Sequence, residues 1–454
     1  MRKFKNKNAA VIGLGFEGRD VVKFLLKVGA KVTIYDKKQL KELDFEDINP
    51  KNVNLITGEN YLSAGLTKYD IIFRSPGVYR YLPEIVEAEK RGSEISNQVK
   101  LFFELFNGKI IGVTGTKGKG TTSTLIYEFL KNSGKDVYIS GNIGAGSLLN
   151  LLENVNKDCF VVLELSSFQL IDLTKSPHIA VVLNITSDHL DWHKNVEEYV
   201  TAKKNIVSHQ EKYDFSVINS DYKTPKSFAK YTKSKVYYFS KNKKVKGCFV
   251  NDGNIVLEID HKKEIIGKAN DLLLRGEHNW ENITAAVCAS FHAGANLKAI
   301  RKVVFSFKGL EHRLELVGEK LGAKFYNDSF ATGPQPTIAA IRSFTEPTTI
   351  ILGGYDKGLD YDELGKVIAE SDHIQGIILI GDLAQKIEKV IKNSGYKNKL
   401  ANLGKSEMKV IIKKAVEFTP KGGNVLLSPA AASFDMFESY KERGKKFKEI
   451  VKSM

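Results

Sequence analysis

A glycine-rich loop with two lysines is the part of the sequence whose residue types suggest a chemistry most directly. Residues 112–122 read Gly-Val-Thr-Gly-Thr-Lys-Gly-Lys-Gly-Thr-Thr, an apolar run leads into them, and a helical pattern begins at 124. Strand, glycine turn and helix in this order are typical of a phosphate-binding loop, because glycines let backbone N–H groups close on phosphate oxygens and a lysine adds positive charge. The flanking strand and helix argue against a chance glycine-rich turn.

The loop departs from the Walker pattern in two respects. The spacing before Lys119 is one residue too long, and Gly120 stands where a serine or threonine should follow the lysine. Mg²⁺ takes oxygen ligands, and the nearest hydroxyls belong to Thr121 and Thr122. The sequence leaves the choice between these two threonines open.

Composition favours an ordinary globular protein that acts on small anionic molecules. The chain has 454 residues, enough for two to four domains, and a net charge of +15. Its lysines are spread along the chain and are not gathered with aromatics on a nucleic-acid motif, so we expect a solvated surface and no nucleic-acid partner. The general positive field would still favour anionic substrates.

Two further features of the composition concern location. No apolar run reaches membrane-spanning length, and the apolar segment behind the basic N-terminus is too short for a signal sequence. Cys159, Cys248 and Cys288 have no paired spacing, which argues for a reducing cytoplasm and against a disulfide frame or a thiolate metal site. We therefore expect a cytoplasmic protein without membrane insertion.

The first hundred residues carry a nucleotide-binding pattern. A strand leads into a Gly-x-Gly-x-x-Gly turn at 13–18, a helix follows, and a second strand ends in Asp36. This dinucleotide-type fingerprint alone would suggest a dehydrogenase. Residues 70–77 end another strand in a Ser-Pro-Gly turn at the same sheet edge, so a mononucleotide or nucleotide-sugar site fits equally well.

Two continuous apolar runs follow the phosphate loop and end in groups that could bind a metal. Residues 159–164 end in Glu164, and residues 179–185 lead into a segment with His189. Such runs are typical of parallel strands covered on both faces, whose carboxyl ends lie where open α/β sheets bind ligands. Glu164 is thus a candidate Mg²⁺ ligand and His189 a second, although an imidazole is an unusual ligand for Mg²⁺.

Alternating strands and helical stretches continue to the C-terminus and predict a third α/β unit with a mostly parallel sheet. Polar groups again stand at the strand ends, which suggests a substrate site. The predicted fold is α/β with three domains: a Rossmann-like domain at 1–97, a P-loop mononucleotide-binding domain with a mostly parallel sheet at 98–308, and a Rossmann-like domain at 309–454.

Taken in order, the motifs of the chain resemble those of the Mur ligases, the ATP-dependent amide-forming family of cell-wall precursor synthesis. The resemblance covers nearly the whole length and rests on eight short motifs, at 114–121, 141–144, 164–170, 184–191, 277–282, 309–313, 327–332 and 352–354. Within the family, the form of 164–169, the glycine-rich N-terminal domain, and 427–433 with Phe437 are most similar to members that add D-glutamate. The Asp-Asn-Pro-Arg motif of the diamino-acid-adding members is absent.

The resemblance implies a magnesium-dependent ligase of peptidoglycan synthesis, and hence of cell-wall biogenesis, cell shape and the division stage of the cell cycle. ATP would phosphorylate the carboxylate of UDP-N-acetylmuramoyl-L-alanine, and the amine of D-glutamate would attack the acyl phosphate and expel phosphate. The first domain would bind the nucleotide sugar, the second ATP and the third the amino acid. We expect a monomer.

The resemblance also assigns roles to individual residues. ATP would be held by Gly115, Thr116, Lys117, Gly118, Lys119, Gly120, Thr121, Thr122, Asn279, Arg313 and Asp328. The nucleotide sugar would be held by Gly15, Phe16, Asp36, Ser75, Pro76, Gly77, Asn142 and His189, and the amino acid by Thr332, Lys357, Ser428 and Phe437.

Catalysis would depend on Lys119, Glu164, His189 and Lys203. Lys119 would hold the β- and γ-phosphates. Thr121 and Glu164 would bind one Mg²⁺, and His189 and a carbamylated Lys203 a second. Carbamylation turns a cation into a carboxylate-like oxygen ligand, which would account for a lysine beside a metal.

Three positions depart from the family pattern. Gly120 is more like the folylpolyglutamate synthetases, which share the central fold. Phe330 stands where many D-glutamate-adding members have a lysine, so one alternative is a Mur-type or folylpolyglutamate-synthetase-like ligase that adds a different amino acid. Phe16 and Glu17 replace the usual small hydroxyl residue of the N-terminal turn, and we expect the carboxylate of Glu17 to point away from the nucleotide.

Two alternatives belong to other classes of protein. A P-loop nucleotide-binding switch protein would need neither a second metal nor a carbamate, so the set of Glu164, His189 and Lys203 argues against it. A Rossmann dehydrogenase would leave the loop at 112–122 unexplained.

Overall fold

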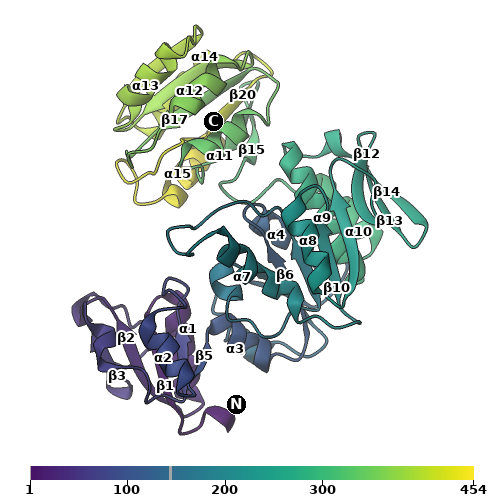
Figure 1. Cartoon of the computed structure of the whole chain (residues 1–454). Coiled ribbons are helices and arrows are strands. Elements are labelled where there is room, and N and C mark those ends of the chain that lie inside the picture. The colour runs from purple at the N-terminus through teal and green to yellow at the C-terminus, as the bar shows by residue number, and fades with distance from the viewer. Residues whose placement is uncertain (1, 143–145) are drawn as a thin grey trace. The chain divides into compact units, whose positions relative to one another are not determined.

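The computed structural model describes residues 2–142 and 146–454, and this part of the chain forms an α/β protein with three sheets (Figure 1). Contacts divide it into two compact units. The first comprises the chain up to Asn270 together with Trp280–Val304, and the second comprises Asp271–Asn279 and Phe305–Met454. The α/β class with mostly parallel sheets is confirmed, and the domain borders at 97 and 308 stay predictions.

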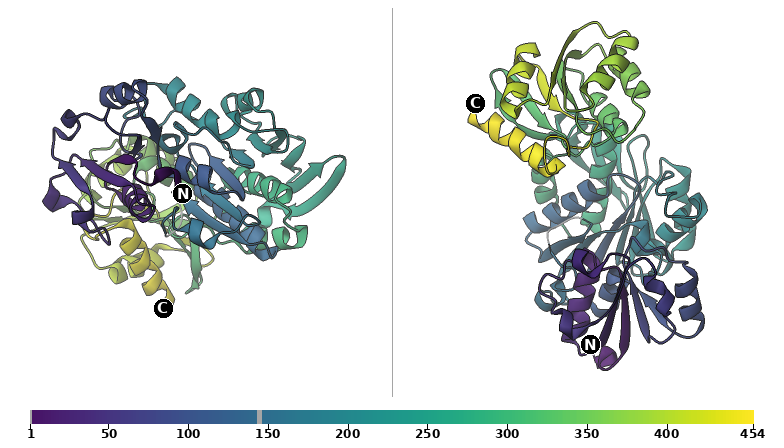
Figure 2. Two further views of the ribbon diagram at one scale, coloured as in Figure 1. Left: turned by 90° about the horizontal axis from the view of Figure 1, so that it is seen from below. Right: turned by 90° about the vertical axis from the view of Figure 1, so that its left-hand side faces the viewer.

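The N-terminal sheet is built from five parallel strands. Its elements are β1 (Asn8–Ile12), α1 (Phe16–Lys27), β2 (Lys31–Asp36), β3 (Asn54–Thr57), β4 (Ile71–Arg74), α2 (Pro83–Lys90) and β5 (Glu94–Ser96). The strand order is β3-β2-β1-β4-β5. The chain reverses its direction of winding between β1 and β4, so a ligand crevice is expected at the carboxyl ends of these two strands. The right-hand view of Figure 2 shows the strands between helices on either side.

The central sheet has nine strands. Its strands are β6 (Lys109–Thr114), β7 (Val137–Gly141), β8 (Phe160–Glu164), β9 (Ile179–Val182), β10 (Phe215–Asn219), β11 (Lys235–Ser240), β12 (Gly247–Asn251), β13 (Asn254–Ile259) and β14 (Lys262–Lys268). The order is β14-β13-β12-β11-β10-β9-β6-β8-β7, parallel from β7 to β12 and antiparallel in the last two pairs. The phosphate loop follows β6, which lies between β9 and β8.

The helices that accompany the central strands precede the sheet, connect its strands or follow it. They are α3 (Gln98–Leu105), α4 (Lys119–Asn132), α5 (Leu151–Asn154), α6 (Ser167–Leu170), α7 (Val196–Ser208), α8 (Lys223–Ser227), α9 (Glu277–His292) and α10 (Leu297–Ser306). Helix α4 packs on β6, β7 and β8, and α7 packs on β6. These two helices bring their side chains to the carboxyl edge of the sheet.

The third sheet has six strands. Its elements are β15 (Glu315–Lys320), β16 (Ala323–Asn327), α11 (Pro334–Ile341), β17 (Thr348–Gly353), α12 (Asp362–Ala369), β18 (Ile374–Ile380), α13 (Ala384–Asn393), β19 (Lys399–Gly404), α14 (Met408–Phe418), β20 (Asn424–Leu427) and α15 (Tyr440–Ser453). The order is β15-β16-β20-β17-β18-β19, with β15 and β16 forming an antiparallel hairpin and the other pairs parallel.

Apolar side chains hold these layers together. Strands β17 and β20 are buried at every position, as expected for parallel strands covered on both faces. In the first unit, one cluster of buried apolar residues includes Val11 of β1, Phe102 of α3 and Leu163 of β8, so the N-terminal and central sheets share a continuous core. Within the described residues, none of the helices has the length and apolarity needed to cross a bilayer.

Candidate functional site

The phosphate loop joins β6 to α4, and neighbouring side chains approach its backbone so closely that glycine is required. Gly118 has a φ of 85°, in the left-handed region that favours glycine, and a Cβ on it would overlap the side chain of Asn282. A Cβ on Gly115 would lie 2.7 Å from the Cβ of Leu183. The loop therefore presents backbone groups at the N-terminus of α4, which is the geometry that suits a phosphate.

Lys119 is folded over this loop. Its Nζ donates hydrogen bonds to the carbonyl oxygens of Gly115 at 3.1 Å and Thr116 at 3.0 Å. The backbone N–H of Thr116 donates to the carbonyl of Asn184 at 2.8 Å, which ties the loop to the segment after β9. Lys119, the glycines and the N-terminus of α4 thus form one candidate phosphate-binding site at 115–122, which we call the cradle.

Gly112 does not belong to the cradle. It lies within β6, where a Cβ would be 2.8 Å from Cγ of Pro177 and 3.0 Å from Cδ1 of Leu165. Packing against neighbouring side chains explains this glycine. The loop proper begins at Gly115. The spacing from Gly112 to Lys119 is therefore not a property of the loop, because Gly112 is a strand residue.

The two candidate hydroxyls of the loop differ in environment. Thr122 is fully buried, and its Oγ1 lies 3.4 Å from Oδ1 of Asn282. Thr121 is half-buried on the first turn of α4. Of the two threonine side chains, Thr121 is therefore the one that solvent reaches.

Glu164 lies beside the phosphate loop at the carboxyl edge of the central sheet. In the parallel registers it stands opposite Val113 of β6 and Gly141 of β7. The backbone N–H of Asn142 donates to the carbonyl of Glu164 at 3.2 Å. Residues 143 and 144, the second half of the predicted motif at 141–144, lie outside the described residues.

Lys203 of α7 is buried beneath the same loop. Its Nζ donates to the carbonyl of Gly115 at 3.1 Å and to Oγ1 of Thr114 at 3.3 Å, and lies 4.8 Å from the centroid of the Tyr199 ring. Burial, with the nearby charge of Lys119, lowers the pKa of Lys203 well below its ordinary value. This environment disfavours the ammonium form of Lys203 relative to the neutral amine.

His189 stands in a strained conformation between two aromatic rings. Its φ is 54°, unusual for a residue with a side chain. The imidazole lies 4.8 Å from the ring of Phe168 and 6.5 Å from that of Tyr199, measured between centroids. Its Nε2 is 3.7 Å from Oδ2 of Asp188, and about half of the side chain is exposed. Such strain is typical of functional sites.

The predicted nucleotide-sugar residues of the N-terminal domain gather at the ends of β1, β2 and β4. Asp36 accepts hydrogen bonds from the backbone N–H groups of Leu14 at 2.7 Å and Lys38 at 2.9 Å. Ser75 Oγ donates to the carbonyl of Gly13 at 2.7 Å. These two side chains therefore hold the glycine turn, while Gly15, Phe16 and Gly77 are exposed at the same edge.

Glu17 points toward the central domain. Its Oε1 accepts a hydrogen bond from Nε2 of Gln169 at 2.6 Å, and its buried Oε2 has no hydrogen-bond partner among the described residues. Burial raises the pKa of Glu17 to about 7, with Asp20 adding to the rise and Gln169 and Arg74 opposing it. The carboxyl group therefore carries a proton for part of the time near neutral pH.

In the second unit, Asp328 is the centre of a buried polar group. It follows β16, accepts a hydrogen bond from Oγ of Ser428 at 2.7 Å and another from the backbone N–H of Leu314 at 3.2 Å. Burial raises the pKa of Asp328 to about 7, against the opposing effect of these hydrogen bonds. Ser428, which follows β20, also bonds Oγ1 of Thr337 at 3.0 Å.

Arg313 and Phe330 form a stacked pair in the same unit. The guanidinium carbon lies 3.8 Å from the centroid of the Phe330 ring, and this ring is perpendicular to that of Tyr440, with 5.1 Å between the ring centroids. At the other predicted ATP position, the side-chain amide of Asn279 donates to the carbonyl of Arg275 at 2.6 Å. Phe330 thus supplies an aromatic platform where a lysine was expected from the family pattern.

The remaining predicted residues of the second unit differ in exposure. Lys357 is exposed in the loop after β17, with its Nζ 6.0 Å from the ring of Phe434. Thr332 is half-buried before α11. Phe437 is partly buried and packs against the core formed on one face of the third sheet, so its side chain has a packing role.

Sequence reasoning missed two buried hydrogen-bond networks. His193 joins Oγ of Ser167 at 2.9 Å to Oε1 of Glu198 at 3.1 Å. Arg74 pairs with Asp172 at 2.7 Å, both side chains being almost completely buried. A charged residue that ends an otherwise apolar strand was the available signal for Arg74, but its partner is 98 residues away.

Another cluster could be mistaken for a metal site. In the described part of the chain, one group of histidine and acidic side chains has its ligand atoms close enough together to hold a metal ion. It consists of Glu311, His312 and Glu315. Lys448 bridges the two carboxylates at 2.9 and 2.6 Å. The ammonium of Lys448 thus already pairs with both carboxylates of this cluster.

Comparison with known proteins places this geometry in a family. The chain matches the Mur ligase MurD-like N-terminal domain at 7–97, the Mur ligase middle domain at 113–290 and the Mur ligase glutamate ligase domain at 312–431. The chain therefore belongs to the Mur ligase family, which confirms the resemblance drawn from the motifs.

Relatives match along the whole chain. It is 42% identical to the UDP-N-acetylmuramoylalanine–D-glutamate ligase of Acetivibrio thermocellus, over 100% of this chain and 98% of that protein. It is 39% identical to the ligase of the same name from Symbiobacterium thermophilum, over 99% and 98%. In fold it is similar to the MurF ligase of Thermotoga maritima in complex with ADP, with a TM-score of 0.57, 18% identity and coverage of 100% and 97%.

Proposed function

We propose that this Mur ligase joins D-glutamate to UDP-N-acetylmuramoyl-L-alanine in an ATP-dependent step of peptidoglycan precursor synthesis. Full-length similarity to relatives that carry this activity in their names supports the choice of substrates. One structural observation carries the ligase chemistry. Lys119 and Lys203 both donate to the carbonyl oxygen of Gly115, and Glu164 ends the neighbouring strand in register with Val113.

We assign the triphosphate of ATP to the cradle at 115–122. Lys119 now donates to two carbonyls of its own loop. Phosphate oxygens carry negative charge and form stronger hydrogen bonds with an ammonium, so the lysine would exchange its carbonyl partners for them. The N-terminus of α4 adds a favourable partial charge. Asn279, Arg313 and Asp328 are the residues that we assign to ATP in the second unit.

The residues at this edge also fit magnesium. Bound Mg²⁺ would neutralise charge on the phosphates during transfer. Thr121 and Glu164 offer oxygen ligands for one ion, and the burial of Thr122 favours Thr121 as the hydroxyl. We assign His189 and Lys203 to a second ion.

Lys203 would serve as a ligand only after carbamylation. Its neutral amine would attack the carbon of CO₂, form an N–C bond and lose a proton, which leaves an anionic carbamate. The low pKa and the burial of the side chain support this step. The carbamate would replace the present hydrogen bonds of Nζ to Thr114 and Gly115 by interactions of its oxygens.

The chain's own residues orient the two transfer steps. A carboxylate oxygen of the nucleotide sugar attacks the γ-phosphorus, and ADP leaves. The amine then attacks the acyl carbon and releases a proton, and phosphate leaves with that oxygen. Lys119 neutralises charge in the first step, and the loop N–H groups hold the phosphates in place. Exposed Lys357 has the charge to attract a carboxylate of the incoming amino acid.

The remaining ligand positions are proposed on the same basis. The nucleotide sugar is assigned to Gly15, Phe16, Asp36, Ser75, Pro76, Gly77, Asn142 and His189, and the amino acid to Thr332, Lys357, Ser428 and Phe437. Ser428 would reach a ligand only by giving up its hydrogen bond to Asp328.

The substrate assignment is tested by phosphate release from ATP with UDP-N-acetylmuramoyl-L-alanine and a panel of amino acids. We expect release with D-glutamate, and a product whose mass equals the nucleotide sugar plus one glutamyl residue. Release with L-lysine or diaminopimelate, but not with D-glutamate, would overturn the assignment. One observation favours that second candidate, a ligase for another amino acid: Phe330 places no positive charge next to Arg313.

We further propose that the chain acts as a monomer in the cytoplasm, where ATP and nucleotide sugars are made, with domain borders at 97 and 308. Light scattering after size exclusion tests the first point, since a dimer would elute at twice the chain mass. Limited proteolysis tests the border at 308, because cleavage should concentrate at this exposed connection, whereas the buried residues at 96–98 should be protected.

A further inference from the structure

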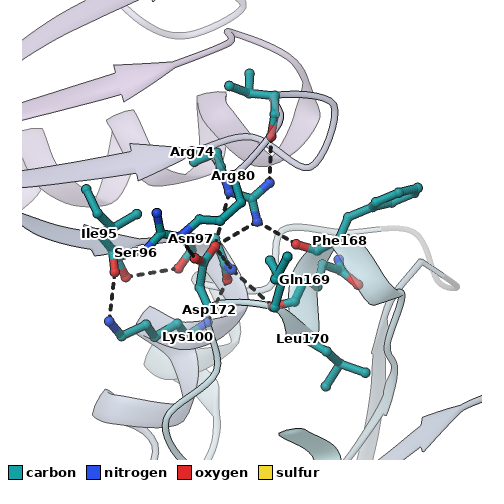
Figure 3. Close-up of polar contacts among 12 residues, drawn as sticks. Arg74, Arg80, Ile95, Ser96, Asn97, Lys100, Phe168, Gln169, Leu170 and Asp172 are labelled. Atoms are coloured by element: carbon teal, nitrogen blue, oxygen red, sulfur yellow. Dashed lines mark hydrogen bonds and ion pairs between the residues drawn. The ribbon is translucent and has the colours of Figure 1, made fainter. Parts of the chain in front are cut away.

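A buried guanidinium connects the N-terminal domain to the central domain. Arg74 ends β4 and is among the largest fully buried side chains of the chain. Its Nε and Nη2 donate to Oδ2 of Asp172 at 3.1 and 2.7 Å (Figure 3). Asp172 lies two residues beyond α6. A charge at the end of the first sheet is therefore neutralised by a carboxylate of the central domain.

The same guanidinium holds the Ser-Pro-Gly turn. Its Nη1 donates to the carbonyl of Val78 at 2.8 Å and to that of Ser75 at 3.3 Å. Ser75 Oγ in turn donates to the carbonyl of Gly13. Arg74 thus fixes both ends of the turn at 75–78, and the turn fixes the glycine turn after β1.

Arg74 also contacts the segments that carry the candidate metal ligands. Its Nη2 donates to the carbonyl of Phe168 at 2.6 Å, four residues beyond Glu164 (Figure 3). Its Cζ lies 5.6 Å from the centroid of the Trp192 ring. Both of these residues touch His189. The Phe168 ring packs against its imidazole, and the backbone N–H of Trp192 donates to its backbone carbonyl at 3.1 Å.

We propose that Arg74 is a positioning residue that holds the nucleotide-sugar turn at 75–78 against the segments of Glu164 and His189. The inference rests on the proposed function, which assigns ligands to these three segments. A buried ion pair adds little stability, because desolvation offsets the attraction. A planar guanidinium with five donors can bond three segments at once, whereas an ammonium is a point charge that cannot reproduce the fork.

The neighbour Arg80 offers a matched control. Its Nε donates to Oδ1 of the same Asp172 at 2.6 Å, and its Nη2 to Oε1 of Glu89 at 2.6 Å. Among the hydrogen bonds of the described residues, none joins Arg80 to the turn at 75–78 or to Phe168. A lysine at position 80 therefore perturbs the shared carboxylate and leaves the turn in place.

The test compares Arg74→Lys and Arg80→Lys in the full chain. Calorimetry gives the Kd of UDP-N-acetylmuramoyl-L-alanine without ATP, and phosphate release gives the KM of each substrate. In Arg74→Lys we expect this Kd and the corresponding KM to rise about tenfold, as for the loss of one or two hydrogen bonds, with the KM of D-glutamate within about twofold of wild type. In Arg80→Lys all of these values should stay within about twofold.

An unchanged Kd in folded Arg74→Lys, or an equal rise in Arg80→Lys, would overturn the proposal. If Arg74→Lys does not fold, the double variant Arg74→Met with Asp172→Leu removes both charges of the buried pair, and Arg80 keeps its ion pair with Glu89. This variant should fold and show the same rise, and a wild-type Kd in it would contradict the inference. A wild-type chain that binds the nucleotide sugar but forms no amide would count against the proposed function only, since the Kd comparison still tests Arg74.

Discussion

Lys203 Nζ lies 3.1 Å from the carbonyl oxygen of Gly115, the first glycine of the phosphate cradle. An amine in this position touches the loop that we assign to ATP, yet its side chain is almost completely excluded from solvent. Burial disfavours the ammonium form, which is the form that cannot react with CO₂. The contact is therefore consistent with a lysine placed for modification and less so with one placed for charge.

Replacing Lys203 with alanine should lower kcat by about a hundredfold or more, because a group that stabilises charge at the phosphates is lost. Short carboxylic acids such as formate should restore part of the activity by supplying the missing carboxylate. Lys204→Ala is the control: this lysine of α7 lies over the ring of Tyr231, and its loss should leave kcat within about twofold. Full activity in Lys203→Ala would rule out the carbamate.

Asp328 predicts a pH dependence of stability. Its pKa is raised from 3.8 to about 7 by burial, so between about pH 4 and pH 7 the folded chain keeps a proton that the unfolded chain has released. The contribution of this proton to the free energy of unfolding is complete below about pH 4 and is lost as the pH rises to about 7. Asp328→Asn should remove this loss, which amounts to a few kcal/mol.

Urea unfolding at several pH values measures this effect as the difference between variant and wild type. Asp372→Asn, at an exposed position, is the control and should follow the wild-type curve. An Asp328→Asn curve that falls as steeply as the wild-type curve between pH 4 and 7 would show that the carboxyl group is ionised in the folded chain.

Phe330 should affect ATP through Arg313. The ring lies 3.8 Å from the guanidinium carbon, and an exposed cation–π contact contributes about 0.5–1 kcal/mol. Phe330→Leu should therefore raise the KM of ATP about two- to fivefold, and Phe330→Trp should keep it near the wild-type value. Tyr213→Leu, at a highly exposed aromatic of the central domain, serves as control. Equal KM values in the Leu and Trp variants would exclude stacking as the reason for this residue.

Gly112 should be sensitive to substitution for a reason unrelated to phosphate. An added Cβ would lie 2.8 Å from Pro177, and overpacking of a core costs about 1–3 kcal/mol. Gly112→Ala should lower the free energy of unfolding by this amount and leave the KM of ATP unchanged. Gly318→Ala, where the added Cβ meets nothing within 4 Å, should be neutral. A large rise in the KM of ATP without loss of stability would show instead that Gly112 takes part in phosphate binding.

Much of the fold could be predicted because the relevant signals are local. Continuous apolar runs indicated the parallel strands β8 and β9, and polar residues after them marked Glu164 and His189. The glycine-lysine loop was recognisable because glycine, lysine and the following helix lie within eleven residues of one another. Such patterns depend only on the period of buried positions and on backbone freedom.

Other parts of the site could not be derived in this way. The choice between Thr121 and Thr122 depends on which side of α4 meets Asn282, which is 160 residues away in the chain. The pairing of Arg74 with Asp172 joins two domains and leaves no periodic trace. Long-range polar contacts are set by the packing of whole elements, so a single sequence shows the residues but not their partners.

The central claim is that the carboxylate of the nucleotide sugar is activated by phosphate from ATP before the amine attacks. The most direct test uses UDP-N-acetylmuramoyl-L-alanine labelled with ¹⁸O in its carboxylate, with ATP and D-glutamate, and mass analysis of the phosphate released. We predict one ¹⁸O atom in each phosphate, because the leaving phosphate takes one carboxylate oxygen with it. Unlabelled phosphate released together with the amide product would contradict the acyl-phosphate mechanism.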